Sequence, residues 1–228
     1  MPAPTKVLAK LAKIIKFGQD VYQLQFLVPN RTIRFKAGQF LHLTLSDFDP
    51  SEGYWPESRV FSIASKPGDQ MIEIIYSVKG NYTQKMSATL TEGMSLWLKL
   101  PYGDFVVERH IKQGQAAVFV AGGTGISPFI PYFLEVIGKD VCPPLRVYYG
   151  IRDADHYLYK EIVETVRTKA DVQIVEGPFD IKMICEEIAG MTEAVCFISG
   201  PPVMIGAFQN GLEHAGFPRE SVIIDAWE

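Results

Sequence analysis

The chain has 228 residues, of which 47% are hydrophobic, 21% charged and 12% aromatic, and its formal net charge is -4. This length fits one large domain or two small ones, and the composition excludes disordered, collagen-like and coiled-coil chains. Residues 1–110 hold 13 Lys and Arg against 10 Asp and Glu, and residues 111–228 hold 9 against 16, so the halves carry +3 and -7. An acidic chain without a dense basic patch argues against a nucleic-acid partner, and the mildly basic first half suits a small anionic ligand.

Cysteine spacing and hydropathy exclude further classes. Cys142, Cys185 and Cys196 do not stand at a spacing that would pre-arrange a metal site, an iron-sulfur cluster or a disulfide framework. No apolar run approaches the ~18 residues that span a bilayer, and we expect no secretion leader, because the first residues do not show a charged segment followed by an apolar one and a small-residue cleavage site. We therefore expect a soluble, cytoplasmic protein without stable membrane insertion.

The first segment, residues 6–16, carries lysines at positions 6, 10, 13 and 16. Their spacing of three or four would place them on one face of a basic amphipathic helix that anchors to a membrane surface. A strand is the favoured interpretation, because the run continues without a helix stop through a turn at residues 18–20 into residues 21–26, which alternate in polarity.

From residue 21 to residue 107, short β-rich runs alternate with turn residues. The runs are 40–45, 60–63, 71–78 and 95–100, and one helical segment, from Thr83 to about Leu90, interrupts them. Regularly spaced short strands without helical periodicity predict an antiparallel barrel or sandwich.

After residue 115 the pattern changes to apolar strands that alternate with helices. The strands are expected at 116–121, 145–149, 172–175 and 195–198, and the helices at 127–138, 158–169, 181–189 and 203–215. Strands that are apolar on both faces and separated by helices predict a doubly wound parallel sheet. We therefore expect two domains, residues 1–110 and residues 111–228.

A glycine-rich turn, Gly122-Gly123-Thr124-Gly125, follows the first apolar strand of the second domain and opens a helix. Glycines let the backbone approach a diphosphate, whose charge then meets free N–H groups and the positive end of the helix dipole. Alone, such a turn is often merely a tight turn. Between a strand and a helix it indicates a nucleotide site.

A second signal lies in the predicted barrel. Arg59 and Phe61 stand two residues apart on one strand and so face the same side, where a guanidinium and a ring can meet the phosphate and the flat part of one ligand. The turn at residues 80–83 offers N–H groups and a hydroxyl to the same phosphates. Taken singly, Phe61 is more often a core residue and Gly80 more often part of a turn.

Together these motifs make the chain resemble the ferredoxin-NADP+ reductase superfamily, from about residue 7 to the last residue. The matching segments are 35–40, 59–62, 80–83, 101–105, 121–125 with Pro128, 149–150 and 199–201. Each is modest, but seven in the correct order are specific. The resemblance implies a six-stranded antiparallel flavin-binding barrel followed by an α/β doubly wound pyridine-nucleotide domain, with hydride passing from nicotinamide to flavin N5 across the cleft between them.

The resemblance assigns the flavin contacts residue by residue. Arg59, Gly80 and Thr83 would bind the pyrophosphate of FAD, Phe61 would lie against the isoalloxazine, and Ser62 would hydrogen-bond near N5. Four further expected cofactor contacts adjoin these residues: Val60, Tyr76, Val78 and Tyr82.

In the second domain, the resemblance implies that the turn at residues 122–125 binds the pyrophosphate of NAD(P). Ser199, Gly200 and Pro201 would flank the nicotinamide. At the end of the sequence, Asp225 would be a polar group beside N5. Trp227 would either cover the flavin ring until nicotinamide displaces it or simply cap the sheet. Three of these residues are the candidate catalytic groups: Ser62, Ser199 and Asp225.

Three departures from the family pattern bear on these roles. Phe61 stands where Tyr is common, which removes a hydroxyl but should keep stacking worth ~0.5–1.5 kcal/mol. Ser199 stands where Cys is common, and hydride transfer needs no thiolate. The segment between Val175 and Val195 is short, which leaves the adenosine end of the pocket least defined.

Glu176 directly follows the strand at 172–175, where NADPH-using relatives typically carry a Ser-Arg pair for the 2′-phosphate. A carboxylate accepts ribose hydroxyls and repels a phosphate, which predicts a preference for NADH over NADPH. Arg152 and Lys182 argue against this preference, since either side chain could neutralise the 2′-phosphate of NADPH.

The sequence therefore predicts a flavin-dependent oxidoreductase that takes hydride from a reduced pyridine nucleotide onto bound FAD. The barrel lacks cysteines for a cluster, so electrons would pass to a small acceptor, to free flavin or to a separate redox protein. Two alternatives stay open: the reductase component of an oxygenase or ferredoxin system, and a non-catalytic FAD-binding electron-transfer or regulatory subunit.

Overall fold

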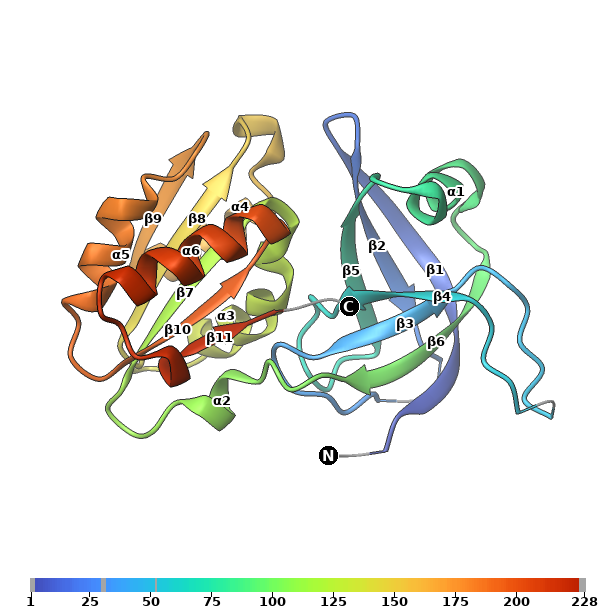
Figure 1. Cartoon of the computed structure of the whole chain (residues 1–228). Helices are drawn as coiled ribbons and strands as arrows, with labels where there is room; N and C mark the ends of the chain where they lie inside the picture. The colour runs from blue at the N-terminus through green and yellow to red at the C-terminus, as the bar shows by residue number, and fades with distance from the viewer. Residues whose placement is uncertain (1–2, 30–31, 52, 226–228) are drawn as a thin grey trace.

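The computed structural model describes residues 3–29, 32–51 and 53–225. A β domain and an α/β domain lie side by side, with the first half of the chain in one and the second half in the other (Figure 1). The predicted two-domain fold class is confirmed.

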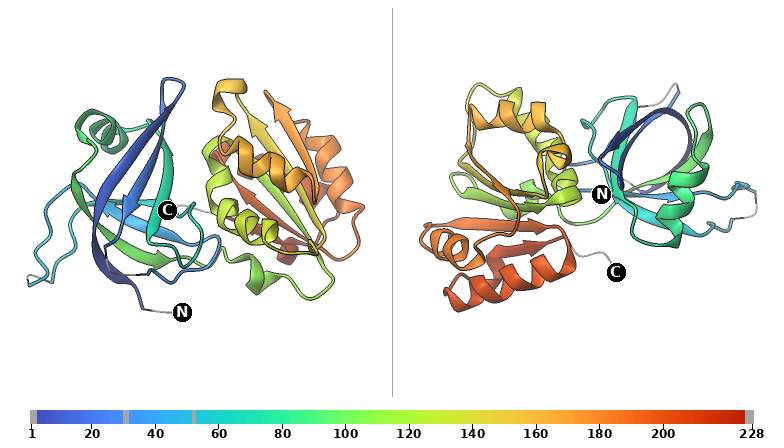
Figure 2. Two further views of the ribbon diagram at one scale, coloured as in Figure 1. Left: turned by 180° about the vertical axis from the view of Figure 1, so that it is seen from behind. Right: turned by 90° about the horizontal axis from the view of Figure 1, so that it is seen from above.

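The first domain is a six-stranded antiparallel sheet in the order β4-β3-β6-β1-β2-β5. The backbone N–H of Ala64, just past β4, donates to the carbonyl of Glu73 in β5 at 2.8 Å, so the two edge strands meet and the sheet closes. Figure 2 shows the resulting barrel end on. Its elements are β1 (Thr5–Phe17), β2 (Val21–Leu27), β3 (Phe40–Thr44), β4 (Ser58–Ser62), β5 (Met71–Ser77), helix α1 (Asn81–Thr89) and β6 (Ser95–Tyr102).

The lysine-rich first segment is strand β1, as the favoured interpretation predicts. Val7, Ala9 and Leu11 alternate into the barrel core. The pairing with β2 shifts register between Leu11 and Lys13, and this bulge adds one residue on the outer side. The bulge lets Lys10 and Lys13 both be exposed on a strand although they stand three residues apart, so no helix is needed. Within the described ranges, no helix has the length and apolar character needed to cross a membrane.

The second domain is a five-stranded parallel sheet in the order β11-β10-β7-β8-β9. Helices α3 and α4 cover one face and helices α5 and α6 the other (Figure 2). Alternate residues of the central strand β7 point to opposite faces of the sheet. Phe119 packs in the core with α3 and α4, and Val118 packs in the core with α5 and α6. The elements are β7 (Ala116–Gly122), α3 (Ile130–Ile137), β8 (Leu145–Ile151), α4 (Lys160–Arg167), β9 (Asp171–Glu176), α5 (Ile181–Ala189), β10 (Ala194–Ser199), α6 (Pro202–His214) and β11 (Val222–Ile224), with short 3₁₀ helices at Gly123–Phe129, Ala154–His156 and Arg219–Ser221.

A short helix, α2 (Val107–His110), connects β6 to β7. The boundary that we predict between residues 110 and 111 falls at the end of this helix. It stays a prediction about where one folding unit ends and the next begins.

The first helix of the second domain differs from the sequence prediction. We predict a helix over residues 127–138, whereas the chain first makes a 3₁₀ helix, Gly123–Phe129, and α3 begins only at Ile130. Pro128 has no N–H with which to bond the Thr124 carbonyl in an α-helix, and the Ser127 hydroxyl donates to that carbonyl instead, at 2.8 Å.

Candidate functional site

A cleft of about 850 Å³ lies between the barrel and the parallel sheet. Its nucleotide-domain wall is made where β7, β8, β9 and β10 end, at Gly122, Gly150, Gly177 and Ser199. The chain order of the strands reverses between β7 and β10, and ligands of doubly wound sheets bind at the carboxyl ends of strands beside such a reversal. The cleft therefore opens where the topology favours a ligand.

The barrel wall of the cleft combines aromatic and aliphatic side chains with hydroxyl groups and a lysine. Phe61 and Tyr76 both line it, are almost fully buried, and meet edge to face with ring centroids 6.0 Å apart. Tyr22 stacks on Tyr76 at 5.5 Å. Val60 and Ser62 also line the cleft, and Ser62 is only 7% exposed. A planar aromatic ligand fits a wall of this kind, with one hydroxyl at its edge.

The glycine turn forms the opposite wall, where residues 122–125 all line the cleft. A Cβ on Gly125 would stand 2.3 Å from the backbone carbonyl oxygen of Ser199, so no larger residue fits there without moving the β10 backbone. The glycine thus lets the turn after β7 lie directly against the end of β10, with Gly200 and Pro201 beside it in the cleft wall.

Arg59 does not line the cleft between the domains. Its guanidinium donates to Glu57 Oε1 and to the Ser58 carbonyl, both at 2.9 Å, and lies 4.8 Å from the centre of the Tyr82 ring. The Tyr82 hydroxyl donates to the Leu43 carbonyl at 2.8 Å, which ties α1 to β3. Arg59 thus has carboxylate and carbonyl partners, and it is half exposed.

The turn that opens α1 uses its own polar groups. Thr83 Oγ1 accepts from the N–H of Lys79 at 3.0 Å and of Gly80 at 3.1 Å, and donates to the Gly80 carbonyl at 3.0 Å. We expect this hydroxyl and the Gly80 N–H to meet phosphates, whereas here they cap the helix. Capping and ligand binding use the same groups at a helix start, so the sequence pattern does not separate them.

Ser199 and Asp225 form a buried polar pair at the end of β10. Ser199 Oγ donates to Asp225 Oδ2 at 2.9 Å, and both residues are at most 5% exposed. Burial raises the pKa of Asp225 to about 7, and the hydrogen bond from Ser199 partly opposes this. A carboxyl group that exchanges a proton near neutral pH therefore adjoins the cleft lining.

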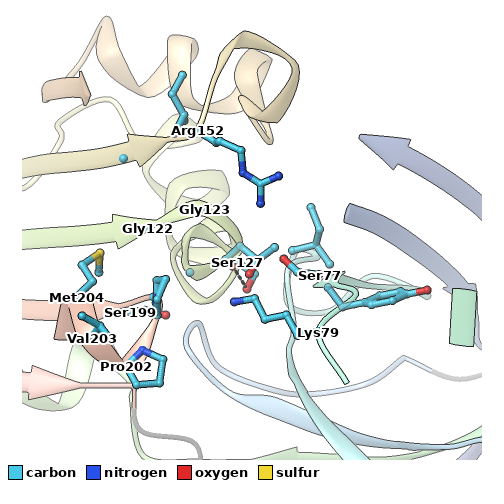
Figure 3. Close-up of a pocket in the computed structure, with 18 of the residues that line it drawn as sticks. Ser77, Lys79, Gly122, Gly123, Ser127, Arg152, Ser199, Pro202, Val203 and Met204 are labelled. Carbon is cyan, nitrogen blue, oxygen red and sulfur yellow. Dashed lines mark hydrogen bonds between the residues drawn. The ribbon is translucent and has the colours of Figure 1, made fainter. Parts of the chain in front are cut away.

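Two cations and no acid are found among the described residues that line the cleft (Figure 3). Lys79 extends from the barrel toward the nucleotide domain, and Arg152 extends from the end of β8 toward the barrel. The chain carries a net charge of -4, so the cleft is a local exception that favours an anionic ligand. No sequence motif identifies Lys79 as a site residue. Arg152 is identified from the sequence only as a cation that could offset the repulsion between Glu176 and a 2′-phosphate.

The structure brings most of the predicted site residues to one cleft. Those that line it are Val60, Phe61, Ser62, Tyr76, Thr83, Gly122, Gly123, Thr124, Gly125, Ser199, Gly200 and Pro201. Those that lie outside its lining are Arg59, Val78, Gly80, Tyr82, Glu176 and Asp225. Trp227 falls outside the described residues. Which of them contact a ligand stays a prediction.

Sequence reasoning missed the apolar end of the cleft, beyond β8 and β9. Phe179 lines it and packs edge to face on Phe208, with centroids 5.3 Å apart. A Cβ on Gly150 would stand 2.6 Å from the Phe179 ring, so the ring fits only because residue 150 is glycine. The glycine of the Tyr149-Gly150 motif was the one available signal.

Comparison with known proteins agrees with this geometry. Residues 6–181 match the FAD-binding domain family. The chain is 26% identical to the NAD(P)H-flavin reductase of Vibrio harveyi, over 87% of this chain and 88% of that protein. It is 25% identical to the reductase component of propane 2-monooxygenase from Rhodococcus jostii, over 96% of this chain but only 63% of that protein.

Among solved structures, a ferredoxin NADP+ reductase from Neisseria gonorrhoeae with bound FAD and NADP superposes with a TM-score of 0.77 at 16% identity, over 99% of both chains. This likeness shows the fold. The family match covers more than half of the chain, in both domains. The chain therefore belongs to the FAD-binding domain family, and its two domains have the fold of the ferredoxin-NADP+ reductases.

Proposed function

We propose that this protein is a flavin-dependent NAD(P)H oxidoreductase that passes electrons from a reduced nicotinamide nucleotide through FAD to an acceptor. The observation that carries the proposal is the cleft. Its barrel wall of Phe61, Ser62 and Tyr76 faces the glycine turn and Ser199, and its charged lining residues are all cations in the described part of the chain. The flavin reductase and the monooxygenase reductase among its relatives support the same class of activity.

The barrel residues fit a flavin. Phe61 and Tyr76 offer an apolar surface to the isoalloxazine, and Ser62 offers a hydroxyl at the edge that faces the nucleotide domain. The ion pair of Arg59 with Glu57 is exposed and therefore weak, so it leaves the guanidinium able to turn to a phosphate. When bound, the flavin supplies the two-electron chemistry that no side chain of the protein provides.

The nucleotide-domain residues hold and orient the hydride donor. The turn at residues 122–125 takes the pyrophosphate, and Ser199, Gly200 and Pro201 bound the space for the nicotinamide. Asp225 accepts from the Ser199 hydroxyl and, with a pKa that burial raises to about 7, can take up or release a proton near neutral pH. Holding donor and acceptor atoms about 3–3.5 Å apart, with water excluded, is the main contribution that such a protein makes to the rate.

Purification and anaerobic reduction test the proposal. We expect the protein to bind one flavin per chain, released as FAD rather than FMN, and the visible flavin absorption to bleach when NADH is added without oxygen. A bound flavin that NADH and NADPH leave oxidised would instead favour the non-catalytic subunit. Turnover with a panel of small acceptors, free flavins and redox proteins then identifies the class of acceptor.

We further propose a preference for NADH over NADPH. Glu176 ends β9 with an exposed side chain, next to Gly177 in the cleft wall. At ~5 Å in water-like surroundings, each unit of phosphate charge costs roughly 0.8 kcal/mol, so one to two units of charge favour NADH by about four- to sixteenfold. The ratio of kcat/KM for the two nucleotides measures the preference. Glu176→Ala should narrow it, and a wild-type ratio near one or in favour of NADPH would contradict it.

A further inference from the structure

The turn between β1 and β2 reaches across to the nucleotide domain. Asp20, in this turn, accepts from both ends of the Arg152 guanidinium: Nη1 is 3.2 Å from Oδ1, and Nη2 is 3.2 Å from Oδ2. The two residues lie 132 positions apart in the sequence. In two views, the tip of the β1–β2 hairpin lies beside the loop that follows β8 (Figures 1 and 2).

A histidine fixes this contact. His156 Nδ1 lies 2.7 Å from Asp153 Oδ1, and its Nε2 lies 3.4 Å from Asp20 Oδ1. The ring is only 12% exposed, and the backbone of Gly18 lies so close that a Cβ there would stand 2.6 Å from Nε2. The hairpin tip is therefore packed on the imidazole, which sets the place of the Asp20 carboxylate.

Arg152 belongs to the cleft as well as to this contact. It follows Ile151, which pairs in register with Glu176 at the ends of β8 and β9. The start of its side chain is therefore at the same sheet edge as Glu176 and Gly177, while its guanidinium points to the barrel (Figure 3). A guanidinium is a strong partner for phosphate, so an anion at this sheet edge and the Asp20 carboxylate compete for one group.

We propose that Asp20 is a specificity-determining residue that holds Arg152 on the barrel side and so withholds it from a 2′-phosphate at the adenosine end of the cleft. The inference rests on the proposed function, because it takes the cleft to be a nicotinamide-nucleotide site. A nucleotide with a free 2′-hydroxyl has no need of Arg152 at that position. A 2′-phosphorylated nucleotide must first separate Arg152 from Asp20.

The contact is a positioning device and leaves the hydride-transfer groups alone, so the test compares the binding of two probes to the full chain by calorimetry. Adenosine 2′,5′-bisphosphate carries the 2′-phosphate, and AMP lacks it. In Asp20→Asn, the ratio of the two affinities should move about three- to tenfold toward the bisphosphate, the range expected when an exposed carboxylate is removed from a guanidinium that can meet a phosphate.

Three matched variants separate this cause from others. Asp20→Glu keeps a carboxylate within reach of Arg152 and should hold the ratio near the wild-type value. Asp155→Asn removes the same charge from an exposed residue three positions from Arg152 and should leave the ratio unchanged. In Asp20→Asn combined with Arg152→Gln, the shift toward the bisphosphate should disappear.

Two results would overturn the inference alone: AMP binds normally and the ratio is unchanged in Asp20→Asn, or Asp155→Asn shifts the ratio as much as Asp20→Asn does. If AMP and NADH both fail to bind the wild-type protein, the proposed nucleotide site is wrong, and the inference falls with it.

Discussion

Ser62 brings one nearly buried hydroxyl to the barrel wall of the cleft. We expect Ser62→Ala to slow flavin reduction by NADH about 10²-fold, because a group that aligns donor and acceptor acts on the rate. Flavin affinity should change little, since one hydroxyl adds little to the apolar contact of Phe61 and Tyr76. Stopped-flow reduction and a flavin titration measure the two quantities.

Ser65→Ala is the matched control for this variant. Ser65 is 8% exposed and lies outside the cleft lining, where its hydroxyl accepts from the Glu73 N–H at 3.2 Å. Its loss should leave the reduction rate near wild type. Equal slowing in both variants would show that Ser62 acts through barrel stability and not through alignment.

Asp225 links the site to the pH dependence of folding. Its pKa is raised by burial from an ordinary 3.8 to about 7, so the folded protein holds a proton that the unfolded chain releases. The contribution of Asp225 to the free energy of unfolding should therefore be greatest below about pH 4, fall as pH rises toward 7, and level off above that. About three pH units at 1.36 kcal/mol each set an upper bound of roughly 4 kcal/mol on the change.

Asp225→Asn removes this titration. We expect the variant to lose most of the decline between pH 4 and pH 7 and to be more stable than wild type at pH 8, as measured by urea unfolding. Asp69→Asn, in an exposed turn, serves as the control and should follow the wild-type curve. A wild-type slope in Asp225→Asn would mean that this carboxyl is ionised throughout that range.

The residues that the sequence could identify are those whose role depends on their own strand or turn. Phe61 and Ser62 follow from a strand motif, and residues 122–125 from a turn between strand and helix. Lys79, Phe179 and Asp20 could not be found in this way. Each of these residues has its proposed role only because a segment remote in sequence lies beside it in the fold. A local sequence pattern carries no information about such a contact.

At the level of elements, the barrel strands were well predicted because buried and exposed residues alternate along them, and the strands of the parallel sheet because they are continuous apolar runs between helices. The start of α3 was not, because apolar spacing continues through residues that adopt a 3₁₀ helix. The interaction that sets where α3 begins is local but polar. The Ser127 hydroxyl donates to the Thr124 carbonyl, because Pro128 has no N–H to donate to it. The spacing of apolar residues does not show that a side-chain hydroxyl has replaced a backbone N–H as the hydrogen-bond donor.

The packing of β8 against the segment before α5 gives a test at this scale. In Gly150→Ala, the new methyl would overlap the Phe179 ring and push it toward the cleft. Overpacking of this kind typically costs about 1–3 kcal/mol of folding stability. Because the displaced ring lines the cleft, we expect AMP and NADH to bind about tenfold more weakly, a loss of ~1.4 kcal/mol. Flavin binding on the barrel wall should be unchanged, and calorimetric titrations of both ligands check this.

Gly206→Ala is the control, because a Cβ at Gly206 in α6 meets nothing within 4 Å. It should bind nucleotide as the wild type does. Adding Phe179→Leu to Gly150→Ala makes room for the methyl and should recover part of the affinity. Nucleotide binding that is unaffected in Gly150→Ala would show that the Phe179 ring does not shape this end of the cleft.

At the scale of the whole molecule, one hydrophobic core joins the two domains. Val21, Ala37 and Ile75 of the barrel belong to the same buried cluster as Ile126 and Phe129 of the nucleotide domain. The two walls of the cleft are therefore held in a fixed relation by packing as well as by the Asp20 and Arg152 contact. Two domains were predictable from the change in strand pattern, but their orientation was not, because residues from both contribute to one core.

The charge distribution of the whole molecule gives the last prediction. Lys79 faces a cleft without acids among its described lining residues, within a chain of net charge -4, whereas the charge of Arg152 is paired with Asp20. Local positive potential speeds the association of an anionic dinucleotide, and salt screens it: the Debye length falls from about 30 Å at 0.01 M to about 8 Å at 0.15 M ionic strength. The association rate of NADH should therefore fall about three- to tenfold over that range, and by less in Lys79→Gln. Lys85→Gln, an exposed lysine of α1 outside the cleft lining, should keep the wild-type slope in stopped-flow measurements. If Lys79→Gln also kept that slope, net charge remote from the cleft would govern association, and the two lining cations would matter only after the nucleotide has bound.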